Sequence, residues 1–197
     1  MPEAARRTVF FMTHPDVVID PAVPVPHWPL SDRGRARMQA ALARPWVRRI
    51  AAVHSSTERK AIDAATILAN GLGLPVSTHA RLGENDRSAT GYLPRAEFEA
   101  VADAFFARPT ESVRGWERAV DAQARIVAAV NLVLSAAPPD GDVAIVSHGA
   151  VGALLLCALE GIAIDRAQDQ PPGNGGHYYP FDLHTRLLRH GWTAIDA

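Results

Sequence analysis

The sequence predicts an α/β fold with a mainly parallel sheet that helices cover on both faces. Short, apolar, β-rich segments alternate along the chain with longer segments that have helical periodicity. The segments 7–13 and 142–148 are apolar at nearly every position, which is typical of central strands in a covered sheet. No linker or low-complexity tract divides the chain, so residues 1–197 are expected to form a single domain.

Each predicted element has a local cause. Ser31 and Asp32 are candidate N-caps before a helix with apolar positions such as Met38 and Leu42. Ser56 or Thr57 is expected to cap the next helix, which glycines end. In chain order, the predicted strands are 7–13, 48–54, 74–80, 142–148, 177–183 and 185–192, and the predicted helices are 33–44, 58–72, 95–107, 115–137 and 150–161. The segment 82–94 is polar and too long for a simple connection, which makes it a candidate functional loop.

Composition excludes several classes of function. The net charge of -1 gives no sign of a nucleic-acid partner. No apolar run has the length of a membrane span or of a secretory signal, so we expect no membrane partner and a cytoplasmic location. The single cysteine, Cys157, excludes a disulfide within one chain and a cysteine metal cluster. The eight histidines lack a recognised metal-ligand spacing, so no metal is expected.

Two histidines directly follow strand-like segments. His14 comes after RTVFFMT, and His148 comes after DVAIVS. Ligands of parallel α/β sheets bind at the carboxyl ends of the strands, so these two side chains are expected to meet in one site. Gly149 follows His148 where a helix is predicted to begin, and the backbone N–H groups of a helix N-terminus suit an anion.

Two further segments bring charged groups to the same edge of the sheet. Arg59 and Lys60 lie in the first turn of a predicted helix, where the helix dipole disfavours cations, so an anionic ligand explains them better. Glu84 lies in the polar loop and is a candidate proton donor. Together these groups suit phosphoryl transfer: one imidazole attacks phosphorus, the cations and the second imidazole bind the phosphoryl oxygens, and a carboxylic acid protonates the leaving oxygen.

The same segments resemble the histidine phosphatase superfamily, which includes the cofactor-dependent phosphoglycerate mutases. The resemblance rests on FFMTHP, LSDRGRARMQAAL, HSSTERKAIDAATILA, LGEND, GWERA and VAIVSHGAVGALL. It implies a three-layer α/β/α sandwich, no cofactor, no metal, and a phosphohistidine intermediate. By position it makes His14 the nucleophile, Glu84 the proton donor and His148 the second histidine of the pocket, with the backbone of Gly149 near the phosphate.

The sequence departs from the family pattern around the phosphate. The family opening Arg-His-Gly is here Thr13-His14-Pro15, and Asp20 stands where the family often has a phosphate-binding asparagine. Threonine cannot replace the bidentate grip of an arginine, and proline has no N–H to donate.

The cations of the first helical turn depart from the pattern as well. Lys60 aligns with the family's second arginine, and Arg59 precedes it. Successive helical residues point about 100° apart, so we favour Lys60 as the cation of the pocket and keep Arg59 as the alternative. Arg87, in the loop of Glu84, is a further candidate cation. The candidate phosphate-binding residues are thus Thr13, Arg59, Lys60 and Gly149.

These features favour a metal-free phosphomonoester hydrolase that acts on a small phosphorylated molecule. The alternative is a catalytically silent relative that binds an anionic ligand or a partner protein, which Thr13, Pro15 and Asp20 favour. A mutase is a minor alternative, because it needs an arginine-rich pocket that this sequence lacks. The sequence specifies neither the natural substrate nor the oligomeric state, and a homodimer is compatible with it.

Overall fold

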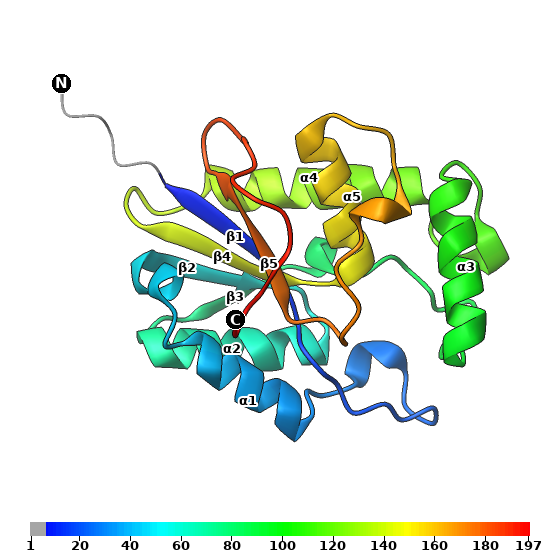
Figure 1. The fold of residues 1–197 in the computed structure, drawn as a ribbon, viewed down its shortest axis with the longest axis horizontal. Helices are drawn as coiled ribbons and strands as arrows, with labels where there is room; N and C mark the ends of the chain where they lie inside the picture. Colours follow the sequence, from blue (N-terminus) through cyan, green and yellow to red (C-terminus); the bar gives the residue numbers. More distant parts are fainter. Residues whose placement is uncertain (1–6) are drawn as a thin grey trace.

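The centre of the protein is a six-stranded sheet in the order β3-β2-β4-β1-β5-β6, seen in a computed structural model that describes residues 7–197 (Figure 1). The strands are β1 (Thr8–Thr13), β2 (Ile50–Ser55), β3 (Val76–Thr78), β4 (Asp142–Ser147), β5 (His177–Asp182) and β6 (Thr193–Ala194). The pairs β1–β4, β2–β4 and β2–β3 are parallel, whereas β5 runs antiparallel to β1 and β6. The prediction of a mainly parallel sheet is confirmed.

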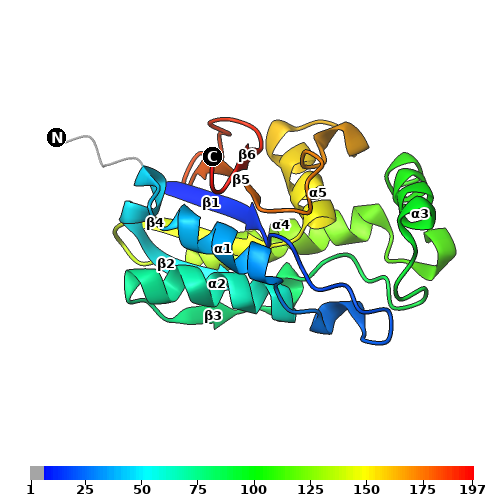
Figure 2. The ribbon, with the colours of Figure 1, turned by 60° about the horizontal axis from the view of Figure 1, so that its bottom comes forward.

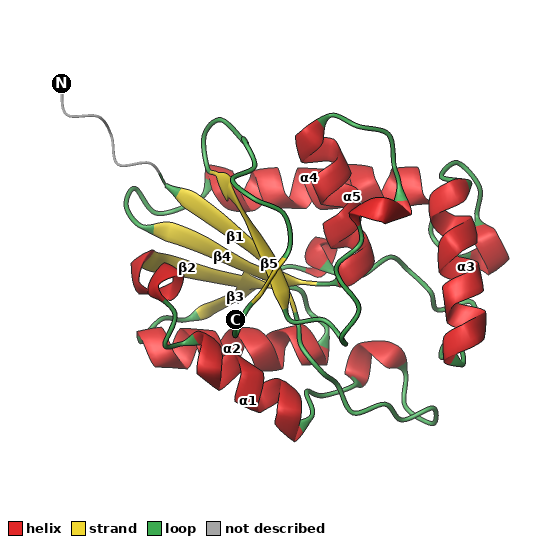
Figure 3. Ribbon diagram, in the orientation of Figure 1, coloured by secondary structure: helices red, strands yellow, loops and turns green. Residues whose placement is uncertain are grey.

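Helices cover both faces of the sheet and give a three-layer sandwich (Figure 2). The helices are α1 (Asp32–Ala41), α2 (Arg59–Leu72), α3 (Arg95–Ala107), α4 (Ala119–Ser135) and α5 (Gly149–Glu160). Helices α1 and α2 lie together on one side of the sheet, α4 and α5 lie on the other, and α3 stands beyond the strand ends (Figure 3). Strand β1 serves both cores, because Phe10 and Met12 pack with the α1–α2 side while Val9 and Phe11 pack with the α4–α5 side.

The helix ends follow the sequence signals in part. The Ser31 hydroxyl accepts a hydrogen bond from the N–H of Gly34 at 3.1 Å, so the predicted cap of α1 is confirmed. Gly73 ends α2 in the left-handed region with φ of 67°. The predicted cap of α2 at Ser56 or Thr57 is wrong, because Glu58 is the N-cap residue and leaves its own side chain free for other contacts.

The predicted strand 185–192 is wrong. The carboxylate of Asp182 accepts hydrogen bonds from the N–H groups of His184 and Thr185, and Arg186 adopts a left-handed φ of 64°, so the chain turns where a strand was expected. Strand β6 begins only at Thr193. The predicted strand 74–80 and helix 115–137 exist as the shorter β3 and α4.

No helix among residues 7–197 is long and apolar enough to cross a membrane.

Candidate active site

The register of two parallel strands brings His14 and His148 together. Thr13 of β1 pairs with Ser147 of β4, and the next residue on each strand is a histidine. The N–H of His14 donates to the carbonyl of Ser147 at 3.2 Å, and the two imidazole centroids lie 5.2 Å apart at an angle of 65°. The structure thus brings the two strand-end histidines side by side.

The imidazole of His14 is held in one orientation and one tautomer. Its Nδ1 lies 2.9 Å from the carbonyl oxygen of Pro15, and a carbonyl only accepts, so Nδ1 carries the proton and Nε2 keeps its lone pair. Burial and the nearby Lys60 ammonium lower the pKa of His14 to about 4. At neutral pH the ring is therefore an uncharged base with a free Nε2, the form that a nucleophile requires.

The glycine-rich loop before β5 fixes the backbone of His14. The N–H of Gly176 donates to the carbonyl of His14 at 3.1 Å. At Gly175, where φ is 78°, a Cβ atom would lie 2.2 Å from the same carbonyl oxygen, so only glycine allows this approach. The segment GNGG, which has no obvious role in the sequence, thus sets the position of the candidate nucleophile.

His148 is fully buried and bound on one side only. Its Nε2 lies 2.7 Å from the Ser56 hydroxyl and 3.3 Å from Oε1 of Glu58, whereas its Nδ1 has no hydrogen-bond partner among the described residues. Burial lowers the pKa of His148 well below 6.5, although the Glu58 carboxylate acts in the opposite direction. A buried ring nitrogen without a partner is costly in a folded protein, and a bound ligand would satisfy it.

Lys60 and Glu58 form a buried ion pair beside the histidines. The Lys60 ammonium donates to Oε2 of Glu58 at 2.5 Å and to the carbonyl of Val25 at 2.9 Å. Burial opposes the ionisation of Glu58, but His148 and Lys60 beside it lower its pKa to about 2. Because Glu58 is ionised, it compensates the positive charge of Lys60 within the site.

Sequence reasoning missed Glu58. Its Oε1 accepts the backbone N–H of Glu84 at 2.9 Å, so the same carboxylate joins Lys60, His148 and the polar loop. The available signal was the lysine itself, because a buried ammonium needs an anionic partner and Glu58 lies two positions earlier.

Glu84 lies at the N-terminus of α5. Its Oε1 accepts the N–H groups of Asn85 and Val151, both at 3.1 Å, and its Oε2 accepts that of Ala150 at 3.3 Å. The loop that carries it is fixed by Arg125, whose guanidinium donates to the carbonyls of Gly83 and Glu84. A carboxyl group is thus held between the helix that follows His148 and the residues around Glu58.

Two candidate phosphate-binding residues lie in positions that do not suit this role. Arg59 is exposed on α2 and forms an ion pair with Asp63 at 2.7 Å, whereas Lys60 is buried, so the structure brings Lys60 and not Arg59 to the histidines. Thr13 is buried, and its hydroxyl donates to Oε1 of Gln170 at 2.6 Å and accepts the N–H of His177 at 3.1 Å. The Thr13 hydroxyl therefore serves to join β1 to the segment before β5.

Gly149 leaves room for the side chain of Gln170 at the start of α5. It is the first residue of the helix, whose leading N–H groups have no acceptor within the helix. A Cβ atom at this position would lie 2.6 Å from Nε2 of Gln170. Any larger residue would therefore press on the side chain that holds Thr13.

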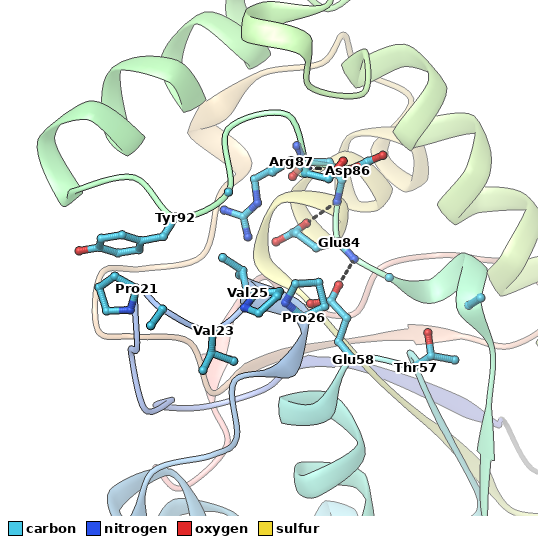
Figure 4. A pocket seen from close by; sticks show the side chains of 17 residues that line it. Pro21, Val23, Val25, Pro26, Thr57, Glu58, Glu84, Asp86, Arg87 and Tyr92 are labelled. Atoms are coloured by element: carbon cyan, nitrogen blue, oxygen red, sulfur yellow. Dashed lines mark hydrogen bonds between the residues drawn. The ribbon is translucent and has the colours of Figure 1, made fainter.

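A cavity of about 670 Å³ opens beside Glu58 and Glu84 (Figure 4). One wall is the proline-rich segment 21–26, and Tyr92 and Arg87 of the polar loop form part of the opposite side. The rings of Trp28 and Tyr92 lie 5.8 Å apart, so the aromatics of the two loops pack against each other. Asn85 also lines the cavity, and its buried amide has no hydrogen-bond partner among the described residues.

No group of three or more histidine, cysteine, aspartate or glutamate side chains in the described part of the chain is arranged to hold a metal ion.

Comparison with known families identifies the class of protein. Residues 25–179 match the model of the histidine phosphatase superfamily (branch 1), so the chain belongs to this superfamily. The matched segment contains Lys60, Glu84 and His148 but begins after His14, where the sequence reads Thr13-His14-Pro15. A comparison with curated proteins gives no match.

Solved structures with the same fold include phosphatases. The chain is similar to mycobacterial glucosyl-3-phosphoglycerate phosphatase, with 25% identity and a TM-score of 0.77 over 95% of this chain and 99% of that chain. A structure of that mycobacterial phosphatase with VO3 matches with 27% identity and a TM-score of 0.75, again over 95% of this chain and 99% of that one. YhfR of Bacillus stearothermophilus shares the fold, with 22% identity and a TM-score of 0.75 over 94% of this chain and 95% of that chain. Family and neighbours together support a phosphatase function.

Proposed function

We propose that the protein is a metal-free phosphomonoesterase that works through a phosphohistidine at His14. The observation that carries this proposal is the neutral imidazole of His14, whose Nε2 is free because Nδ1 is bound to the carbonyl of Pro15. His148 lies against it, with its ring centroid 5.2 Å away. An oriented, uncharged imidazole is a competent nucleophile toward phosphorus.

The reaction has two steps. In the first, Nε2 of His14 forms a bond to phosphorus, the bond from phosphorus to the ester oxygen breaks, and the carboxylic acid form of Glu84 gives its proton to the departing oxygen. In the second, water attacks phosphorus with Glu84 as the base, the P–N bond breaks, and inorganic phosphate leaves. Each step returns Glu84 and His14 to the state that the other step needs.

The phosphoryl oxygens are bound by groups around His148. The N–H of Gly149 is one donor on this side, because those of Ala150 and Val151 are bound to Glu84. The unpartnered Nδ1 of His148 is a second donor when the Ser56 hydroxyl donates to Nε2 of the same ring. Lys60 contributes positive charge, although Glu58 compensates part of it. We assign these residues to phosphate binding and do not retain Arg59, which is paired with Asp63 on the exposed side of α2.

The cavity beside Glu84 is the natural place for the leaving group. It adjoins the proton donor, and its wall from Pro21 to Pro26 consists of proline, alanine and valine. Such a lining suits the apolar part of a small organic phosphate.

The first experiment is hydrolysis of p-nitrophenyl phosphate and a panel of metabolite phosphates by the wild type and His14→Ala. We expect turnover in the wild type, none in His14→Ala, and an alkali-stable, acid-labile phosphoenzyme after rapid quenching of the wild type. His184→Ala is the matched control, because His184 is an exposed histidine in the turn after β5. Turnover that persists in His14→Ala would contradict the proposal.

The second candidate function is binding without catalysis. The ion pair of Lys60 with Glu58 favours it, because a cation that is already paired stabilises the charge of a transition state less than an unpaired arginine would. Binding of inorganic phosphate by a wild type that has no turnover on the panel would support this function and exclude the hydrolase.

A further inference from the structure

The candidate site has one cation without a carboxylate partner among the described residues. Position 13 is a threonine, and the Lys60 ammonium is bound by Glu58 and by a backbone carbonyl. The charged groups that act on His14 are Lys60, Glu58 and Arg87, and Arg87 acts on His148 as well. Because Lys60 is paired with Glu58, Arg87 is the second cation that acts on both histidines.

Arg87 is held in place by aromatic faces and not by a carboxylate. Its guanidinium carbon lies 5.1 Å from the ring centroid of Phe98 and 5.7 Å from that of Trp116. Within residues 7–197, its guanidinium has no hydrogen-bond or ion-pair partner. Contacts with aromatic faces orient the guanidinium plane and leave the N–H groups at its edge free to donate.

Arg87 lies at the cavity beside Glu84, the candidate proton donor. Arg87 lines the cavity together with Glu58 and Glu84, and its side chain extends toward Glu84 in Figure 4. Trp116, one of the two rings beside it, is buried and donates its indole N–H to the hydroxyl of Thr90 in the same loop at 2.9 Å. The loop thus presents a preorganised arginine at the cavity that Glu84 lines.

Two other arginines near the site already have hydrogen-bond and ion-pair partners. Arg37 is bound by Asp16, Asp196 and two backbone carbonyls of the glycine-rich loop. Arg125 is bound by Glu117 and by three backbone carbonyls. Neither can turn to an anion without breaking buried contacts.

We propose that Arg87 binds the phosphoryl group of the substrate and supplies from the polar loop the arginine that position 13 lacks. The proposal rests on the phosphatase function proposed above. The probe ligands are inorganic phosphate and orthovanadate, which present the same oxygens as the transferring group. Binding of these anions is measured separately from turnover, so that a failure of one proposal can be distinguished from a failure of the other.

The test compares Arg87→Met and Arg87→Lys with the wild type by calorimetric binding of both anions and by steady-state hydrolysis. Methionine keeps apolar contact with Phe98 and Trp116 but removes the charge. We expect Arg87→Met to lose about 10²- to 10³-fold in kcat/KM, the loss typical of one transition-state donor, with weakened vanadate binding. Arg87→Lys should recover only part of the loss, because a lysine cannot donate in a bidentate fork. Arg59→Gln is the control for removal of one positive charge, and it should behave as the wild type.

Rescue by added guanidinium ion distinguishes a role of Arg87 in phosphate binding from a role in the structure of the loop. In Arg87→Ala, free guanidinium ion should restore part of the turnover, which a loop disordered by the substitution would not allow. Arg87→Met that binds phosphate and turns over substrate within about twofold of the wild type overturns the proposal. Phosphate binding that depends on Arg87 in a protein without His14-dependent turnover upholds this proposal and overturns the hydrolase. A wild type that binds neither anion overturns both.

Discussion

At the scale of single residues, the state of His14 depends on one adjacent residue and on one that is distant in the sequence. The carbonyl of Pro15 sets the tautomer, and burial with Lys60 lowers the pKa. The proline that replaces glycine after the nucleophile removes a donor N–H, but its carbonyl still binds Nδ1. The proline at this position therefore leaves the imidazole of the candidate nucleophile oriented.

We predict that His14 titrates near pH 4 and not near 6.5. As the pH falls below 6.5, the unfolded chain binds a proton at this position before the folded chain does. The contribution of His14 therefore lowers the free energy of unfolding as the pH falls from 6.5 toward 4. NMR titration of the ring protons, assigned with His14→Ala, gives the midpoint directly. A midpoint near 6.5 would mean that the ring is not shielded from water.

The sequence could identify those candidate site residues whose positions depend on local patterns. His14, His148, Lys60 and Glu84 stand at strand ends, a helix start and a polar loop, and such positions follow from local patterns and chain topology. Local patterns do not predict the ion pair of Glu58 with Lys60 or the internal hydrogen bonds of Thr13. They depend on side-chain directions at the helix start and on residues about 160 positions away, which no local pattern contains.

At the scale of elements, α1 is fitted closely against the segment that follows His14. A Cβ atom on Gly34 would lie 2.2 Å from the carbonyl oxygen of Asp16. That oxygen also accepts the N–H of Ser31 at 2.9 Å, so it cannot move away without breaking the start of the helix. The first turn of α1 and the loop after β1 thus hold each other in position.

Gly34→Ala should therefore destabilise the protein, although alanine normally favours a helix over glycine. We expect a loss of about 1–3 kcal/mol in the free energy of unfolding, because the clash is with backbone. Denaturation in urea measures it. Gly191→Ala is the control, since its Cβ would meet no atom within 4 Å, and it should change stability by less than about 0.5 kcal/mol. Equal stability of Gly34→Ala and the wild type would disprove the close approach.

Most elements could be predicted from the sequence, and the failures have a common cause. The strand β1 and the helix α3 have clear periodicity, and the predicted helix 95–107 coincides with α3. The false strand 185–192 is apolar enough for a sheet, but the side chain of Asp182 turns the chain back on itself before it. Side-chain to backbone bonds of this kind compete with regular structure and are weakly encoded in residue type.

At the scale of the whole molecule, we expect the cavity and the charges around it to select the substrate. Three carboxylates line it, those of Glu58, Glu84 and Asp86, against the one guanidinium of Arg87. A leaving group that carries a second negative charge would face these carboxylates, whereas an uncharged apolar group would contact the proline-rich wall.

We predict at least about tenfold higher kcat/KM for benzyl phosphate than for 3-phosphoglycerate, a ratio that corresponds to about 1.4 kcal/mol. Both are esters of alkyl alcohols, so the comparison reports on the cavity more than on intrinsic reactivity. Val23→Lys, which places a positive charge on the proline-rich wall, should narrow the ratio. A wild type that prefers 3-phosphoglycerate would show that the cavity does not receive the leaving group.

The strand order has a consequence for the synthesis of the protein. Val9 of β1 pairs with Val143 on one side and Phe181 on the other, so β1 has no neighbours in the sheet until β4 and β5, more than 120 residues later, have been made. Its run VFFM stays without strand partners until then, and such segments are prone to aggregate. His14 therefore meets His148 only after β4 has been made, and a chain that stops before β4 carries the candidate nucleophile without the second histidine of the candidate site.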